Sequence, residues 1–373
     1  MKEILLFEDV FGLFGGIEKV ISDIVADADE KEFHLSLYAN HFISDEYLPF
    51  LNQHHVKVYQ ARNEYVENPA KRHLKGYRLF KTFLRNNKFD VIHFNVSNSI
   101  DLKYPRIAKH VGIKNIIVHC HNDDATSRLK RMAHKVIKPF RRNCANYYLA
   151  CSPKAGKWLY NRRILESKNY FTLPNGINIQ EFRFSESFRR SHRPEFTLDE
   201  MTLLVMHVGR FNKQKNQIKA LTVFSEVHKK NPNSKLVFFG TGDNLLISTL
   251  KRKATELGLD DCVQIHKPIS NINEYYNCFD CFLFPSLYEG FGLVFLEAQR
   301  NGLPCVVSDT VPEIARVSPL VTYHPLDEKD DRWAKDVLSC KAQNHPNLSD
   351  VVDTSSIDVH RQVKLILDLY RKN

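Results

Sequence analysis

Two carboxylates stand in an otherwise apolar stretch of the chain, "PSLYEGFGLVFLEAQRNG", residues 285–302. Glu289 and Glu297 flank a Gly-Phe-Gly turn. On a helical wheel of about 100° per residue, Glu297 falls between Leu293 and Val294, on the face that must pack against the protein. We therefore expect Glu297 to be buried. A buried carboxylate is costly without hydrogen-bond donors, so a protein group or a ligand must supply them.

A basic pair follows an apolar run earlier in the chain. The segment "LLVMHVGR" ends in Arg210, and Lys215 stands in the next loop, just before a helical pattern. The planar fork of Arg and the compact charge of Lys together suit a diphosphate. Basic residues in loops are also commonly solvated, so this pair becomes informative only beside the other motifs.

Glycines provide two turns at which an anion or a sugar can approach the backbone. Gly290 and Gly292 flank Phe291 ahead of a helix, where backbone amides and the helix dipole favour negative charge. Gly15 and Gly16 stand at a second strand-to-helix turn near the amino terminus. Neither turn fits G-x-G-x-x-G, and "FFGTGDN" lacks the third glycine, so the sequence does not support an NAD site.

The elements that must position these residues alternate between β-rich runs and amphipathic helices. Six strands are expected in each half, as "EILLFED", "HLSLYAN", "VKVYQ", "DVIHFNV", "NIIVHCH" and "YYLACS", then "TLLVMHVGR", "KLVFFGTG", "DCVQIHK", "CFLFPS", "PCVVSD" and "LVTYH". Repeated βαβ units predict parallel sheets with helices on both faces. The polar stretch 184–200 separates the two series.

The predicted fold class is therefore α/β, with two Rossmann-like doubly wound domains facing across a cleft. We expect one domain over 1–185, a second over 186–355, and a final helix over 356–373 that could pack back on the first domain. Ligands of such folds bind at the carboxyl ends of the strands.

Composition narrows the class of protein further. The 373 residues carry a net charge of +10, and the first 190 hold 31 Lys and Arg against 20 Asp and Glu, which indicates an acidic partner for that half. No apolar run reaches the roughly 20 residues that cross a bilayer. The eight cysteines are irregularly spaced, as in a reduced cytosolic protein, and Cys278 and Cys281 form a lone C-x-x-C without a second pair.

Taken together, the motifs resemble glycosyltransferase family 4, the retaining enzymes of the GT-B fold, over nearly the whole chain. The resemblance rests on "GGIEKV", "VHCHNDD", "LPNGIN", "GRFNKQKN", "FFGTGD" and above all "PSLYEGFGLVFLEA", which matches the family's E-x7-E signature. Within the family, the chain is most similar to bacterial exopolysaccharide and capsule enzymes, which build sugar chains on a lipid carrier.

The resemblance implies that the domain over 1–185 binds the acceptor and that the domain over 186–355 binds the nucleotide-sugar. It also implies a role for each site residue. Glu297 would accept hydrogen bonds from the ribose hydroxyls of a nucleotide-sugar donor, and Arg210 and Lys215 would hold its diphosphate. Glu289 and His121 would contact the donor sugar, with His119 as a structural neighbour or a second site residue. Gly16 would border the phosphate and acceptor side.

The resemblance also implies chemistry without a cofactor or a metal, because basic residues and helix amides neutralise the leaving diphosphate. The "DAD" at 27–29 imitates a metal-binding D-x-D but is interpreted as a solvated turn at a helix end.

The chain departs from the family pattern at two places. Asn178 replaces the usual Asp of "LPNGIN", and "SDTVPEI" lacks paired glycines, which leaves the phosphate-side loop and the donor sugar undefined.

The expected reaction is retaining transfer from a UDP-sugar to a lipid-linked saccharide, at the cytoplasmic face of the cell membrane. The stretches 71–88 and 127–142 each hold seven basic and no acidic residues, and we expect them to attach peripherally to an anionic membrane; ordinary solvated helices are the alternative. A sugar-nucleotide epimerase of GT-B architecture, and a transferase with a soluble or protein acceptor, remain open. A glycosidase and a nucleic-acid-binding protein explain the E-x7-E segment poorly, and we expect no nucleic acid partner.

Overall fold

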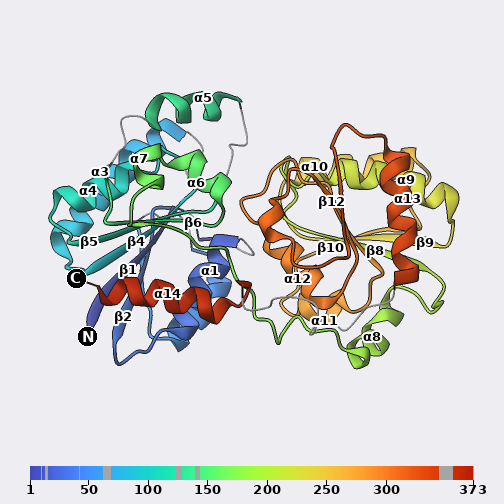
Figure 1. Ribbon diagram of the computed structural model, residues 1–373, viewed down its shortest axis with the longest axis horizontal. Helices are drawn as coiled ribbons and strands as arrows, with labels where there is room; N and C mark the ends of the chain where they lie inside the picture. Colours follow the sequence, from blue (N-terminus) through green and yellow to red (C-terminus); the bar gives the residue numbers. More distant parts are fainter. Residues whose placement is uncertain are drawn as a thin grey trace. The chain divides into compact units, whose positions relative to one another are not determined.

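The chain forms two compact units, each built on one parallel sheet (Figure 1). The computed structural model describes residues 1–9, 11–12, 16–41, 43–61, 69–122, 128–138, 143–343 and 356–372. Unit 1 comprises Met1–Asn175 and Val359–Asn373, and unit 2 comprises Gly176–Asp358. The break therefore falls ten residues before the expected boundary at 185.

Unit 1 is a seven-stranded parallel sheet in the order β3-β2-β1-β4-β5-β6-β7. Its strands are β1 Lys2–Glu8, β2 Phe33–Ala39, β3 Lys57–Gln60, β4 Val91–Val96, β5 Asn115–Cys120, β6 Tyr147–Ala150 and β7 Tyr170–Thr172. Its helices are α1 Gly16–Asp27, α2 Leu48–Gln53, α3 Pro69–Asn86, α4 Lys103–His110, α5 Arg128–Ile137, α6 Pro153–Leu159, α7 Arg162–Leu165 and α14 Val359–Arg371. The first six strands match the predicted ones, and β7 was not predicted.

Unit 2 is a six-stranded parallel sheet in the order β10-β9-β8-β11-β12-β13. Its strands are β8 Leu203–Val208, β9 Ser234–Phe239, β10 Val263–His266, β11 Cys281–Phe284, β12 Cys305–Ser308 and β13 Val321–His324. Its helices are α8 Glu186–His192, α9 Gln217–Lys230, α10 Asn244–Glu256, α11 Ile272–Tyr276, α12 Leu293–Asn301 and α13 Asp330–Ser339. All six strands were predicted, and the two Rossmann-like sheets confirm the fold class.

The central strands are buried on both faces, as parallel sheets between helices require. All six residues of β4 and of β5 are buried, and so are the first five of the six residues of β8. In unit 1, α3 covers the sheet with Phe80, which contacts Phe7 and Tyr38 at ring-centroid distances of 5.0 Å. This aromatic contact explains why a strongly basic helix is held on the domain.

The final helix, α14, is part of unit 1. Its Val363, Ile366 and Tyr370 are buried in the same apolar cluster as α1 and β2. The Lys2 ammonium donates to the carbonyl of Arg371 at 2.7 Å, so the two ends of the chain are joined. The structure thus places α14 where the sequence suggested that it could pack.

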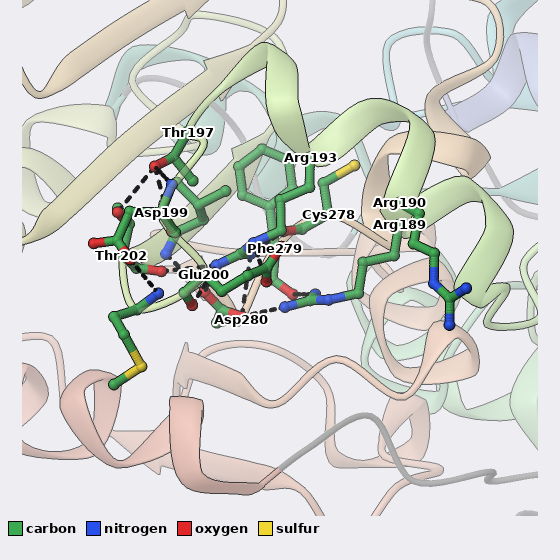
Figure 2. Close-up of polar contacts among 12 residues, drawn as sticks. Arg189, Arg190, Arg193, Thr197, Asp199, Glu200, Thr202, Cys278, Phe279 and Asp280 are labelled. Atoms are coloured by element: carbon green, nitrogen blue, oxygen red, sulfur yellow. Dashed lines mark hydrogen bonds and ion pairs between the residues drawn. The ribbon is translucent and has the colours of Figure 1, made fainter.

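The polar stretch 184–200 is firmly attached to unit 2 rather than forming an open linker (Figure 2). Arg193 is 1% exposed, and its guanidinium donates to the Thr202 carbonyl at 2.8 Å and to Asp280 at 3.2 Å. Arg189, on α8, binds the other oxygen of Asp280 at 3.0 Å. The polar stretch therefore contains a buried ion-pair network, in which Arg189 and Arg193 bind Asp280 just before β11.

Candidate active site

The predicted donor-site residues of unit 2 gather where the order of the sheet reverses. β8 and β11 are neighbours at the centre of the sheet, but the chain leaves β8 toward β9 and leaves β11 toward β12. Loops that diverge in this way open a crevice at the carboxyl ends of the two strands. Arg210 and Lys215 follow β8, and Glu289 to Gly292 follow β11, so both motifs belong to this one crevice.

Lys215 and Glu289 form an ion pair across the crevice, with Nζ and Oε1 2.8 Å apart. The side chain of Glu289 is 5% exposed and that of Lys215 is 16% exposed. The Lys215 ammonium also lies 4.7 Å from the ring centroid of Phe284, at the end of β11. The cation therefore has both an acidic and an aromatic contact on the opposite loop.

Hydrogen bonds to backbone carbonyls hold these two loops together. The Leu287 amide donates to the Gln214 carbonyl at 2.8 Å, and the Gln214 side chain donates to the Tyr288 carbonyl at 3.0 Å. The Asn216 side chain donates to the Pro285 carbonyl at 3.0 Å. The positions of Lys215 and Glu289 are thus fixed by the chain segments on either side of each residue.

Arg210 is exposed and stands on a loop that the "FFGTGD" segment supports. The Phe211 amide donates to the Thr241 carbonyl at 2.8 Å. A Cβ on Gly240 would lie 2.1 Å from the Gly209 carbonyl oxygen, so only glycine permits this approach. The glycines of "FFGTGD" therefore allow this segment to pack closely against the Arg210 loop. Their role is structural, and the motif lacks the third glycine of a dinucleotide-binding fingerprint.

The Gly-Phe-Gly turn leads directly into α12. Gly292 has φ 87° and ψ 67°, a left-handed conformation that a side chain would strain, and α12 begins at the next residue. Gly290 and Phe291, the other two residues of the turn, are buried. The residue before the helix, Gly292, has no side chain that could cap it, and this helix start carries the partial positive charge that attracts anions.

Glu297 is 8% exposed, which confirms the burial expected from the helical wheel. The Tyr276 hydroxyl, at the end of α11, donates to its Oε2 at 2.8 Å. A protein group therefore supplies one of the donors that the sequence left unassigned. Sequence reasoning missed Tyr276, and its only signal was an aromatic residue in the "YYNCFDC" segment.

His121 and Gly16 belong to unit 1. Gly16 is the first residue of α1 and is exposed, while Gly15 lies outside the described residues. His121 follows β5 and is buried, and its Nε2 lies 2.9 Å from Oδ1 of Asn95 at the end of β4. The His119 ring is 4.0 Å away between centroids, so His119 and His121 share one face of the strand as predicted.

Burial keeps this group of histidines neutral. Desolvation, together with the nearby His93, lowers the pKa of His121 to about 3. Desolvation likewise lowers the pKa of His93 to about 3 and that of His119 well below its ordinary value. His121 therefore presents a neutral imidazole at neutral pH.

The cysteines show no sign of reactivity. All eight are buried and none forms a disulfide. Burial raises the pKa of Cys278 to about 12 and that of Cys281 well above its usual range, so both remain protonated thiols. Over the described ranges, no group of three His, Cys, Asp or Glu side chains is arranged to hold a metal ion.

Comparison with known proteins identifies the family. Residues 14–181 match the model of Glycosyltransferase Family 4, and residues 188–318 match that of Glycosyl transferases group 1. The chain is a glycosyltransferase. The expected family resemblance is thereby confirmed, and the crevice between β8 and β11 lies within the part that matches the group 1 model.

Several relatives of the chain are named as glycosyltransferases. It is 27% identical over 70% of each chain to EpsF of Bacillus subtilis, whose name assigns it to the glycosyltransferases. It is 25% identical to the UDP-Gal:alpha-D-GlcNAc-diphosphoundecaprenol alpha-1,3-galactosyltransferase of Escherichia coli, over 61% of this chain and 59% of the relative. Identity to the amylovoran biosynthesis glycosyltransferase AmsD of Erwinia amylovora is 23%, over 83% and 81%.

Solved structures show the same fold. Anabaena HepE in complex with UDP and glucose matches with a TM-score of 0.78 at 17% identity, over 99% of both chains. WaaG, a glycosyltransferase of lipopolysaccharide biosynthesis, matches with a TM-score of 0.75 at 14% identity, over 99% and 100%. At these identities the likeness concerns the fold alone.

Proposed function

We propose that this glycosyltransferase moves a hexosyl group from a nucleotide-diphospho-sugar to a lipid-linked saccharide in exopolysaccharide or capsule synthesis. Two relatives support the substrate classes, since one is named for a UDP-galactose donor with a diphosphoundecaprenol acceptor and another for amylovoran biosynthesis. The HepE complexes with UDP and with UDP-glucose support UDP as the nucleotide. Retention of the anomeric configuration rests on membership of the family.

The observation that carries this proposal is the ion pair of Lys215 and Glu289 beside the start of α12. Lys215, the exposed Arg210 and the start of α12 would together form an electropositive rim. Such a rim suits a diphosphate and stabilises the charge that grows on it as the glycosidic bond breaks. Glu289, held by Lys215, would accept hydrogen bonds from the hydroxyls of the donor sugar.

The remaining residues would bind the rest of the substrates. Glu297, oriented by Tyr276, would accept hydrogen bonds from the two ribose hydroxyls, because the two oxygens of a carboxylate match the two hydroxyl donors of a cis-diol. Phe291 would shape the turn that carries the helix amides. His121 would contact the donor sugar, and Gly16 would let the acceptor or a phosphate approach the start of α1. Lys215, Arg210 and the amides would neutralise the diphosphate without a metal.

Unit 1 also carries features suited to a membrane surface. On α5, Met132 is 59% exposed and Val136 is 67% exposed, one turn apart, with the exposed Lys135 between them. The buried side of this helix is instead formed by His134, whose ring stacks on Trp158 with centroids 3.7 Å apart. Two apolar side chains of this helix are therefore exposed to solvent. We infer peripheral attachment to the cytoplasmic face of the cell membrane, where anionic headgroups attract Lys and Arg.

The second basic stretch, 71–88, adds exposed charge on α3 through Lys75, Arg78 and Arg85. Residues 127 and 139–142 of the other stretch lie outside the described residues. Among the helices described, none is both long and apolar enough to cross a bilayer.

Donor binding and transfer test the proposal directly. A panel of nucleotide-sugars, with UDP-sugars included, should reveal one that raises the melting temperature in proportion to its occupancy. That donor should then label a diphosphoundecaprenol-linked saccharide with an α-linkage, equally with and without a chelator. An altered nucleotide-sugar formed without any acceptor would favour the epimerase, and labelling of only a soluble or protein acceptor would overturn the lipid-linked assignment.

A further inference from the structure

Asn95 and His121 lie beside each other at the carboxyl ends of two paired strands of unit 1. β4 and β5 run parallel, with Val96 opposite Cys120, and the His121 amide donates to the Val96 carbonyl at 3.1 Å. This bond brings the two side chains together, with Oδ1 of Asn95 2.9 Å from Nε2 of His121. Asn95 is 4% exposed and His121 is 7% exposed.

The strand on the other side fixes which end of the Asn95 amide faces the histidine. The Nδ2 group of Asn95 points to the Phe7 carbonyl of β1 at 3.4 Å, and a carbonyl oxygen can only accept. A flipped amide would place two oxygens against each other at that distance. It would also lose the only hydrogen bond that the amide makes with β1. The network therefore selects the orientation in which Oδ1 faces His121.

This orientation determines the tautomer of His121. Because Oδ1 of Asn95 can only accept, Nε2 of His121 must carry the hydrogen, and a neutral ring then has none on Nδ1. Nδ1 has no hydrogen-bond partner among the described residues. The titratable neighbours are His119 on β5 and His93 on β4, which are themselves buried and neutral. His121 thus offers one buried nitrogen that can only accept.

We propose that Asn95 is a positioning residue for glycosyl transfer: it holds His121 in the Nε2–H tautomer, so that Nδ1 accepts a hydrogen bond from a substrate hydroxyl. The inference rests on the proposed function, in which His121 contacts the donor sugar. A neutral acceptor nitrogen binds a hydroxyl and repels a carboxylate. The group that meets His121 is therefore a neutral sugar hydroxyl rather than the acid group of a uronic acid.

Two substitutions of Asn95 separate positioning from a merely structural role. Asn95→Leu removes the acceptor and leaves the imidazole free to change tautomer, so kcat/KM should fall about 10- to 100-fold. Asn95→Asp keeps an acceptor at Nε2 but adds a negative charge that favours protonated His121. Activity of this variant should be rescued at high pH and should be lost as the pH falls, along an acid limb that the parent protein lacks between pH 6 and 8.

Asn115→Leu is the matched control, because Asn115 is a buried residue on β5 whose amide donates to the Leu369 carbonyl of α14 at 3.0 Å. It should lower the melting temperature without changing the pH profile. Nitrogen-15 spectra of histidine-labelled protein supply a second readout. The resonances that vanish in His121→Ala should report Nε2–H in the parent protein and a mixture of tautomers in Asn95→Leu.

The outcomes distinguish a failure of this inference from a failure of the proposed function on which it rests. If the chain transfers a sugar and His121→Ala is inactive, yet both Asn95 variants keep the parental pH profile, positioning by Asn95 is wrong and the function stands. A parent spectrum with Nδ1–H would overturn the inference equally. If no nucleotide-sugar is bound or transferred by the parent protein, the proposed function itself fails, and with it the catalytic purpose assigned to Asn95.

Discussion

The hydroxyl of Tyr276 donates to Oε2 of Glu297 across 2.8 Å, and so one helix end orients the carboxylate of another helix. Burial and the neighbouring carboxylate raise the pKa of Tyr276 well above its usual value, so the phenol remains a donor at any working pH. Tyr276→Phe should weaken nucleotide-sugar binding about three- to tenfold, with kcat nearly unchanged, because ground-state and transition-state contacts to ribose are alike.

Steady-state KM values and calorimetric titration with UDP measure this effect. Tyr275→Phe provides the control, because the Tyr275 hydroxyl binds Glu195 at 3.1 Å and not Glu297. Equal loss in both variants would show that the Tyr276 contact is not specific to the nucleotide site.

The ion pair of Lys215 and Glu289 predicts that substitutions of its two members have opposite effects on the binding of the product UDP. Glu289→Gln removes the carboxylate that competes for the ammonium, so UDP should bind as tightly as before or up to about tenfold tighter, while transfer of the sugar falls. Lys215→Met should weaken UDP binding and lower kcat by about 10²- to 10³-fold, because the diphosphate charge peaks in the transition state. Weaker UDP binding in Glu289→Gln would contradict the competition.

The buried histidines of unit 1 predict sensitivity to acid. His93 and His121 have their pKa lowered to about 3, whereas an unfolded histidine titrates at about 6.5. The unfolded chain therefore binds protons first, and stability that is complete above pH 6.5 is lost as the pH falls toward 3. Each such histidine contributes up to about 1.4 kcal/mol per pH unit within that window.

His119→Leu tests this dependence, because both ring nitrogens of His119 lack a partner in the described part of the chain. Melting temperatures should match or exceed the parent value at pH 7.5 and should decline less steeply down to pH 5. His34→Gln is the control, since His34 lies on the surface beside Glu3. A slope that His119→Leu leaves unchanged would assign the acid sensitivity to other groups.

Arg193 should be essential for unit 2 although it lies outside the crevice. Arg193→Met removes donors from Asp280 and from three backbone carbonyls, and breaking a buried pair costs about 3 to 5 kcal/mol. Arg190→Met should cost below about 1 kcal/mol, because Arg190 is exposed and pairs with Glu186 on the surface. Denaturation by urea would compare the two, and near-equal midpoints would contradict the importance of the network.

The proposed membrane attachment predicts that the exposed apolar residues of α5 and its exposed Lys135 both contribute to vesicle binding. Replacing Met132, Lys135 and Val136 with Ser should reduce binding to vesicles that contain anionic lipid, and salt should weaken the binding of the parent protein. Lys364→Ser with Leu365→Ser is the control on α14, where Leu365 is 50% exposed. Equal binding of the parent protein to neutral and anionic vesicles would favour a soluble acceptor.

Local pattern was sufficient for most of the fold. Period and composition gave twelve of the thirteen strands in the two sheets, and the helical wheel gave the burial of Glu297. β7 was missed because its three residues, Tyr170–Thr172, are too few for a period to be read. These successes concern residues whose environment is determined by their neighbours in sequence.

The errors concern residues whose environment comes from distant parts of the chain. Arg193 was read as part of a polar separator, yet its partner Asp280 is 87 positions away. Tyr276 meets Glu297 only after α11 and α12 pack, and Asn95 meets His121 only after β4 and β5 pair. On α5, the buried side is likewise determined by a distant residue, Trp158, on which the His134 ring stacks. No local signal carries this information.

The membership of α14 in unit 1 has a consequence for how the protein is made. A ribosome synthesises β1 well before α14, with all of Gly176–Asp358 between them. The nascent chain can therefore close unit 2 before unit 1 has acquired the helix that contributes Val363, Ile366 and Tyr370 to its interior. Until α14 has been translated, the faces of α1 and β2 that it will cover remain open to chaperones and to aggregation. A C-terminal truncation would make that nascent state permanent, and its damage would fall on the half of the enzyme translated first.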